Sequence, residues 1–387
     1  MRVFLILTFA AAAFGQSIKL EAVSTPASGS SSQANWARTA QGDPLLSWIE
    51  TTKDGSDALR YAILHVGQWS QPRTIASQRH FFRQAAEIPS VVALSDGTLI
   101  AEWIEAPSGG GDSDAEFVYI AASHDGTTWS KPVMANRDKS QSQHGLASIV
   151  ASGPHEASLI WLQALKGDDG PASLMRTVVD ANGDAGKEES INPDVCQCCP
   201  TSVIQTPQGI LIAYRAHTRQ DIRDITVIRN EKGQWQPKKT VFNDGWKINA
   251  CPTNAASASG SGNHVAVAWY TAAGNMPRAE FAASSDGGAT FGKPVTVSTG
   301  SSYGYVSTAV ASDGSATVSW LERGGQGARL LARRVSPAGA MRTVTEVAHG
   351  SRQDLGYPRL VQSGADTLIA WGGGASKVQT ARLPTGK

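Results

Sequence analysis

One short motif recurs seven times along this chain: an apolar run that ends in a large aromatic residue. Successive aromatic residues lie 51 to 58 residues apart, a period in the range of repeats built from four strands and longer than the common helical repeats. The seven runs end at Trp48, Trp103, Trp161, Tyr214, Trp269, Trp320 and Trp371. The chain is therefore expected to build one small structural unit several times.

Each unit carries the signals of four short strands. A turn such as Ser95-Asp96-Gly97 stands ahead of the aromatic run in several units, with another extended segment upstream, so the two segments form a hairpin. A third extended segment follows the run, and a fourth begins near an aromatic residue and a proline, as in QWSQP and TFGKP. Four strands joined by tight turns are typical of a propeller blade. We therefore predict an all-β protein, a β-propeller of four-stranded blades.

The last repeat unit predicts how the ring of propeller blades closes. From Tyr357 to about Leu383 it shows only three strands before the sequence ends, and SIKLEAVST from Ser17 is expected to supply the fourth. Closure of this kind removes free sheet edges. Seven blades are favoured, in a single domain over residues 16–387. A six-bladed ring with an irregular unit is the alternative if the N-terminal segment belongs elsewhere.

Residues 1–15 are typical of a cleavable signal peptide. Arg2 precedes an apolar run from Val3 to Phe14, and Ala13-Phe14-Gly15 gives the small-residue pattern of a cleavage site. That run is too short to cross a bilayer, and no later segment approaches the roughly 20 apolar residues that a span needs. We expect a secreted or periplasmic protein without a membrane span. The net charge of +1 indicates no nucleic-acid partner.

Two turns carry the motif that suggests a family. Residues 284–291, SSDGGATF, fit the pattern Ser-x-Asp-x-Gly-x-Thr-aromatic, and residues 123–129, SHDGTTW, fit a version shortened by one residue. The Asp carboxylate accepts backbone N–H bonds within such a turn, and the glycine permits a positive φ. On these motifs the chain resembles the sialidase-like superfamily of Asp-box propellers over essentially its whole mature region. The resemblance implies the fold more strongly than the activity, because Asp boxes lie away from the active site.

The resemblance implies a site with three arginines that clamp a carboxylate, a Tyr–Glu nucleophile pair and an Asp acid/base. Guanidinium groups match a carboxylate bidentately. The first arginine of the family stands directly before Ile-Pro, where this chain has Glu87. A glutamate there would repel the carboxylate of a sialic acid. The candidate arginines are therefore Arg83, Arg215 and Arg359, with Trp246 and Tyr357 as further ligand-binding candidates.

The catalytic candidates are Tyr305 or Tyr303 as nucleophile, Glu322 of the segment WLER as its partner, and Glu87. A neutral tyrosine activated by a glutamate avoids placing a carboxylate nucleophile against an anionic sugar. Surface or structural roles are the alternative for each of these residues. Sialidase-type chemistry requires no cofactor.

All four cysteines gather at two matching places in the repeat. Cys196, Cys198 and Cys199 open the fourth unit and Cys251 opens the fifth, so their sulfurs are expected to be neighbours. In an oxidising compartment an even number of cysteines suggests two disulfides, with Cys199–Cys251 joining two blades and Cys196–Cys198 as the second pair. A soft thiolate site for copper or zinc, with His144 or His80, is the alternative, and free thiols are a third interpretation.

Three hypotheses of function follow. The first is a sialidase-like protein that binds, and by its resemblance hydrolyses, a glycan or other small polar ligand at one end of the central channel. The second is a non-catalytic propeller that binds a protein or a glycan and uses the cysteines as a staple. The third is a metal-binding propeller whose thiolates carry its chemistry.

Overall fold

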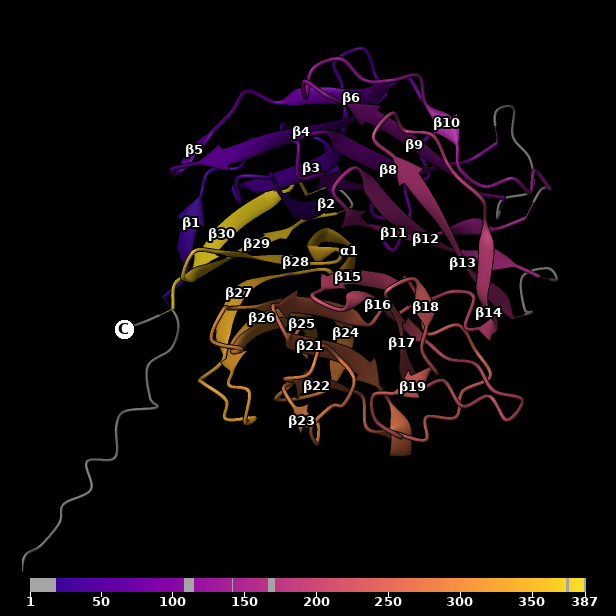
Figure 1. The fold of residues 1–387 in the computed structure, drawn as a ribbon. Helices are drawn as coiled ribbons and strands as arrows, with labels where there is room; N and C mark the ends of the chain where they lie inside the picture. The colour runs from indigo at the N-terminus through magenta and orange to yellow at the C-terminus, as the bar shows by residue number, and fades with distance from the viewer. Residues whose placement is uncertain (1–18, 108–114, 141, 166–170, 374–375, 386–387) are drawn as a thin grey trace, which may run out of the picture.

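The computed structural model describes residues 19–107, 115–140, 142–165, 171–373 and 376–385. The predicted signal peptide, residues 1–15, lies outside this range. Within the described residues the strands form seven antiparallel sheets (Figure 1), which confirms the all-β prediction. None of the described helices is long and apolar enough to cross a membrane.

The first three sheets take up the N-terminal part of the chain. The first contains β2 (Ser31–Arg38), β3 (Pro44–Thr51), β4 (Asp57–His65), β5 (Gln68–Trp69) and β6 (Arg73–Ser77). The second contains β7 (Ser90–Ala93), β8 (Leu99–Glu105), β9 (Phe117–Ser123) and β10 (Val133–Met134). The third contains β11 (His144–Gly153), β12 (Glu156–Ala164), β13 (Ala172–Asp180) and β14 (Glu189–Val195).

Three further sheets follow in the same order. The fourth contains β15 (Ser202–Thr206), β16 (Gly209–Arg215), β17 (Ile225–Glu231), β18 (Gln234–Trp235) and β19 (Lys239–Thr240). The fifth contains β20 (Ser257–Ser261), β21 (His264–Thr271), β22 (Arg278–Ser284) and β23 (Val295–Thr296), with a short 3-10 turn, η1 (Ala273–Asn275), after β21. The sixth contains β24 (Ser302–Val310), β25 (Ala316–Gly324), β26 (Gly327–Val335) and β27 (Thr345–Gly350).

The seventh sheet combines both ends of the chain. Its strands are β28 (Arg359–Ser363), β29 (Asp366–Trp371), β30 (Gln379–Leu383) and β1 (Glu21–Val23), and the short helix α1 (Arg352–Leu355) precedes it. Strand β1 pairs antiparallel with β30, and the two lie side by side in Figure 1, one indigo and the other yellow. The N-terminal segment thus lies where the sequence places a fourth strand.

The repeated aromatic residue lies in the second strand of every sheet. Each is almost completely buried, with an exposed fraction between 0% and 7%. The two Asp-box turns lie between the third and fourth strands of their sheets, as predicted: Asp286 accepts hydrogen bonds from the backbone and hydroxyl of Thr290, and Asp125 accepts backbone bonds from Thr127 and Thr128. Local turn chemistry therefore sets the outer hairpins, while the aromatic residues fill the core between sheets.

The first strands of the sheets, here called the inner strands, contact one another in sequence from β2 to β28, and β28 contacts β2. A serine hydroxyl joins several of these neighbours. Ser202, Ser257 and Ser307 each accept a hydrogen bond of 3.0 Å from a backbone N–H of the next inner strand, at Ala258, Thr308 and Leu360 respectively. One bond of the same kind therefore recurs at the period of the repeat.

We predict that Ser307→Ala lowers the free energy of unfolding by about 1–3 kcal/mol, because the buried N–H of Leu360 loses its acceptor. Urea unfolding followed by tryptophan fluorescence measures the change. Ser301→Ala, at an exposed serine, is the matched control and should shift stability by no more than about 0.5 kcal/mol. Equal effects of the two substitutions would contradict a role for the inter-strand bond.

Candidate functional site

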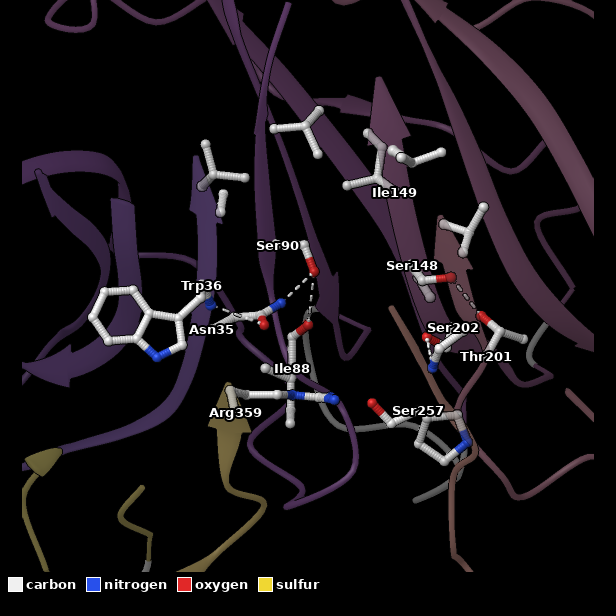
Figure 2. Close-up of a pocket in the computed structure, with 18 of the residues that line it drawn as sticks. Asn35, Trp36, Ile88, Ser90, Ser148, Ile149, Thr201, Ser202, Ser257 and Arg359 are labelled. Atoms are coloured by element: carbon white, nitrogen blue, oxygen red, sulfur yellow. Dashed lines mark hydrogen bonds between the residues drawn. The ribbon is translucent and has the colours of Figure 1, made fainter. Parts of the chain in front are cut away.

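Seven residues hold the same position in the seven sheets and line a central cavity of about 590 Å³ (Figure 2). Each lies in an inner strand and pairs with the residue directly before the repeated aromatic: Ser90 pairs with Glu102 ahead of Trp103, and Arg359 with Ala370 ahead of Trp371. We call this set the cavity ring. Its members are Asn35, Ser90, Ser148, Ser202, Ser257, Ser307 and Arg359.

Arg359 is the charged member of the cavity ring. Serine occupies five of the seven positions, where its hydroxyl can bind a neighbouring strand, whereas the side chain of Arg359 lies in the cavity (Figure 2). Burial lowers the pKa of Arg359. Among the described residues no hydrogen bond or ion pair engages its side chain, and its Nε atom is buried without an acceptor. An enclosed cation of this kind favours an anionic partner.

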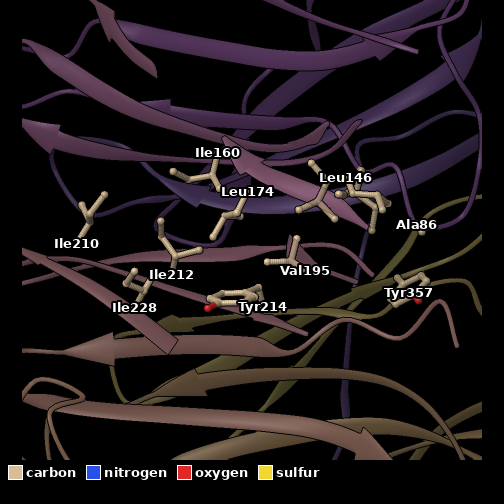
Figure 3. Packing of buried hydrophobic residues seen from close by; sticks show 13 residues of the cluster. Ala86, Leu146, Ile160, Leu174, Val195, Ile210, Ile212, Tyr214, Ile228 and Tyr357 are labelled. Carbon is tan, nitrogen blue, oxygen red and sulfur yellow. The ribbon is translucent and has the colours of Figure 1, made fainter. Parts of the chain in front are cut away.

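A cluster of apolar and aromatic residues packs near the starts of the inner strands, and its member Ile88 lines the cavity. Ile88, Leu146, Tyr305 and Tyr357 each precede a ring residue by two positions and pack in one cluster. Figure 3 shows Leu146 and Tyr357 on one side of this cluster. The rings of Tyr305 and Tyr357 lie with centroids 4.2 Å apart. These two candidates therefore pack against each other just ahead of the cavity ring, and neither is among the residues that line the cavity.

The loop that carries Asn254 fixes the tyrosines. The Tyr305 N–H donates to Asn254 Oδ1 at 2.9 Å, and Asn254 Nδ2 donates to the carbonyl of Tyr303 at 3.2 Å. Gly304 between them has φ +81, and a Cβ there would lie 1.9 Å from Asn254 Oδ1, so only glycine fits. The Tyr357 hydroxyl donates to the carbonyl of Thr253, and burial raises the pKa of Tyr357 well above its usual value.

Glu322, the predicted partner of a tyrosine nucleophile, has a structural role instead. It accepts hydrogen bonds from Trp320 Nε1 at 3.0 Å and from the backbone of Thr299 at 2.8 Å, and it pairs with Arg329 at 3.0 Å. None of its hydrogen bonds within the described chain comes from a tyrosine. The same Trp-x-Glu arrangement, with an arginine on the carboxylate, recurs at Glu50 and Glu105. The structure therefore does not pair Glu322 with a tyrosine, because its carboxylate is bound by Trp320, Thr299 and Arg329.

The three candidate arginines do not all line the cavity. Arg83 pairs with Asp57 at 3.0 Å and donates to Ser32. Arg215 is 1% exposed and donates to the carbonyls of Asn254, Arg223 and Tyr270. Of the three, only Arg359 lines the cavity. The carboxylate clamp implied by the family resemblance is thus reduced to a single guanidinium.

Trp246 and His144 also have structural roles. Trp246 is buried, packs edge-on against Tyr270, and carries the Arg215 guanidinium 4.9 Å above its ring, so it offers no open platform for a sugar. His144 is fully buried; its Nδ1 lies 3.1 Å from the carbonyl of Glu116, and its ring stacks on Phe117. Since these contacts belong to the second and third sheets, His144 does not join the cysteines.

Three buried carboxyl groups, Glu87, Glu102 and Glu116, interact with one another in the second sheet and its loops. Glu87 accepts two hydrogen bonds from the backbone N–H of Leu146, at 2.8 and 2.9 Å, and a further one from Glu116. A Cβ at Gly145 would lie 1.9 Å from Glu116 Oε2, so a glycine is needed for this approach. Burial raises the pKa of Glu87 to about 7 and that of Glu102 to about 8. Glu87, a catalytic candidate, thus faces the protein interior.

The cysteines meet as predicted, but their pairing differs. Cys198, and not Cys199, forms the disulfide with Cys251, with Cα atoms 5.8 Å apart. Cys196 and Cys199 are buried free thiols. The side chains of adjacent residues point to different sides of the chain. The sequence alone does not show which of Cys198 and Cys199 faces Cys251. The bond takes up two of the four sulfurs, so the structure does not present four thiolates to a metal.

The sequence pattern predicted Arg359 but none of the other residues of the cavity ring. The available signal was a polar residue 12 or 13 positions ahead of each repeated aromatic residue. Serine is common at turns and surfaces, so its recurrence is visible only after the inner strands are aligned on the aromatic residues.

The comparisons with known proteins agree with this architecture. A family model described as a BNR repeat-like domain matches residues 45–369. A Dyadobacter fermentans protein of unknown function has 14% sequence identity and a TM-score of 0.54, with 95% of this chain and 97% of that chain covered. No curated protein matches the chain in sequence.

Two structures of carbohydrate-active proteins are also similar in fold. The polysaccharide lyase PL25, an ulvan lyase, has 10% identity and a TM-score of 0.57, covering 92% of this chain and 94% of its own. The Hadza microbial sialidase Hz136 has 12% identity and a TM-score of 0.50, covering 86% and 73%. At these identities the likeness concerns the fold.

Because burial raises the pKa of Glu102 to about 8, the folded state holds a proton that the unfolded state releases above its ordinary pKa near 4.5. This group therefore destabilises the fold progressively as pH rises from about 5 to about 8, by about 1.4 kcal/mol per pH unit at most. We predict that Glu102→Gln, which stays neutral, gains stability over the wild type at pH 8 and much less at pH 5. Urea unfolding at both pH values measures the difference. Glu156→Gln, at an exposed site, should show no such pH-dependent gain, and equal behaviour of the two variants would refute the assignment.

Proposed function

This chain belongs to the BNR repeat-like domain family, and on that premise we propose that it is a secreted or periplasmic propeller that binds an acidic glycan. The seven sheets act as seven blades, and β1 completes the last blade. The ligand site is the central cavity, where Arg359 receives the acidic group of the sugar. The polar members of the cavity ring bind its hydroxyl groups.

The observation that carries this proposal is the replacement of a serine by Arg359 at one of seven equivalent positions. Within the described part of the chain no counter-ion pairs with this enclosed guanidinium, which costs free energy of desolvation. A carboxylate or sulfate would offset that cost through bidentate hydrogen bonds. Hydroxyl and amide groups around it suit a sugar, since ligand cavities combine a few polar anchors with apolar walls.

A structural neighbour supports an acidic ligand. The PL25 lyase structure is described as bound to a fragment written -[GlcA(1-4)Rha3S]-, and that protein has 10% identity and a TM-score of 0.56 to this chain. The ligand of that protein contains a uronic acid and a sulfated sugar. Arg359, which lines the cavity and has no partner among the described residues, suits either of these two acidic groups.

Binding is favoured over sialidase-type hydrolysis. The carboxylate of Glu322 is engaged by Trp320 and Arg329, the hydroxyl of Tyr357 is bonded to Thr253, and Arg83 and Arg215 have protein partners. The predicted glutamate partner of the tyrosine nucleophile and two of the three clamp arginines are therefore engaged by other protein groups. Recognition requires only the cavity as it stands.

Calorimetric titration with oligosaccharides that carry uronic acid or sulfate groups tests the proposal. We predict that Arg359→Ala weakens binding by about 10- to 100-fold, because one charge-assisted contact is lost. Arg359→Lys should recover part of the affinity, since lysine keeps the charge but loses the bidentate geometry. Neutral oligosaccharides of the same length should bind weakly to every variant.

Arg219→Ala is the control, because Arg219 is exposed and lies outside the cavity. Its affinity should equal that of the wild type. Equal affinity of Arg359→Ala and the wild type would overturn the assignment of the cavity. Release of a fluorophore from an aryl sialoside, abolished by Tyr305→Phe, would overturn the preference for binding over hydrolysis.

A further inference from the structure

The disulfide and the two free thiols form one compact group at the junction of the fourth and fifth sheets. Cys196 Sγ lies 3.7 Å from Cys198 Sγ and 3.8 Å from Cys199 Sγ. Cys196 is thus in contact with one sulfur of the Cys198–Cys251 bond and with the second free thiol. The group combines a nucleophile, a disulfide and a second thiol, which are the components of thiol–disulfide exchange.

The two halves of this group differ in exposure. Cys196 and Cys199 are 2% and 1% exposed, whereas Cys251 is exposed and Cys198 is partly buried. The disulfide is therefore accessible from solvent at its Cys251 end, while the thiol pair lies behind it. Exposed disulfides are more often the labile and reactive ones.

Positive charge surrounds Cys196. Arg223 Nη1 donates a hydrogen bond to Cys196 Sγ at 3.1 Å, and the buried guanidinium of Arg215 is close enough to act on the same sulfur. The hydrogen bond with Cys199 and these charges lower the pKa of Cys196, while burial raises the pKa of Cys199. Since the thiolate is the nucleophile, Cys196 is the thiol prepared for attack.

We propose that these cysteines form a thiol–disulfide exchange site in which Cys196 attacks the Cys198–Cys251 bond. The Cys196 thiolate forms a bond to Cys198 Sγ, the bond between Cys198 and Cys251 breaks, and the electron pair leaves on Cys251 Sγ. Cys251 takes its proton from water because it is exposed. One disulfide exists before and after the step, so no oxidant or reductant is consumed.

A second step follows from the contact between Cys196 and Cys199. The Cys199 sulfur attacks Cys196 Sγ, the bond between Cys196 and Cys198 breaks, and Cys198 leaves with the electron pair and accepts the proton of Cys199. The disulfide has then moved from its position between two sheets to the buried pair Cys196–Cys199. The exchange leaves Cys251 as an exposed thiol, able to react with an external thiol or disulfide compound.

Alkylation of the native, non-reduced protein tests this inference. The protein is incubated with a polyethylene-glycol maleimide, quenched in acid and mapped by peptide mass spectrometry. We predict that label accumulates at Cys251 in the wild type and that Cys196→Ser reduces this rate at least tenfold, because the nucleophile is missing. Cys198→Ser, which removes the partner of Cys251, is the positive control and should be labelled at Cys251 at once.

Arg223 variants make the test independent of any folding defect in the cysteine variants. Arg223→Ala should slow labelling of Cys251 roughly fivefold, because a higher thiol pKa lowers the thiolate fraction while each thiolate becomes somewhat more nucleophilic. Arg223→Lys should recover most of the rate. Circular dichroism verifies that each variant is folded.

Four results would overturn the proposal. Absence of label at Cys251 in the wild type would show a static disulfide. Equal labelling of Cys251 in the wild type and in Cys196→Ser would show that Cys196 takes no part. Immediate labelling of all four cysteines, or elemental analysis that finds a tightly bound metal, would show that the native protein holds no disulfide to exchange.

Discussion

The structure depends on one hydrogen bond that recurs between neighbouring inner strands. The hydroxyls of Ser202, Ser257 and Ser307 each accept a backbone N–H of the following strand. Such a bond satisfies an inner-strand donor that its own sheet leaves free, and it sets the distance between one sheet and the next. The side chain must be small as well as polar, because seven strands approach the same cavity.

That constraint explains why the departures from serine carry functional weight. Asn35 still serves as an inter-strand link, since its Nδ2 donates to Ser90 Oγ at 2.8 Å. Arg359 does not, and no described residue pairs with its side chain. Glu102 is a further departure from a small neutral residue. It lies in β8, the strand next to the inner strand of the second sheet, where it pairs with Ser90. A chain that only needed a stable ring would place a small neutral residue at both positions.

The sequence predicts most of the fold, because its signals are local. Strand alternation, Gly-containing turns and the aromatic period each act over a few residues, and they locate the sheets and the Asp boxes correctly. The site was harder to predict, because the partners of Glu322, Arg215 and Cys198 are set by packing. In the sequence Glu322 is a candidate catalytic glutamate, whereas in the structure its carboxylate is bound by Trp320 and Arg329. The recurrence of Trp-x-Glu in three units was the one sequence signal that favoured a structural role.

The segment from Cys251 to Asn254 contacts both the cysteine group and the tyrosines that lie ahead of the cavity ring. Cys251 is bonded to Cys198, while the backbone N–H of Asn254 donates to Cys199 Sγ at 3.4 Å and its side chain binds Tyr303 and Tyr305. The carbonyl of Thr253, between them, accepts the hydroxyl of Tyr357. Four residues therefore connect the sulfur atoms to Tyr303, Tyr305 and Tyr357. Tyr305 and Tyr357 precede Ser307 and Arg359 of the cavity ring by two positions, so the segment that carries one half of the disulfide also holds the residues that lead into two positions of the ring.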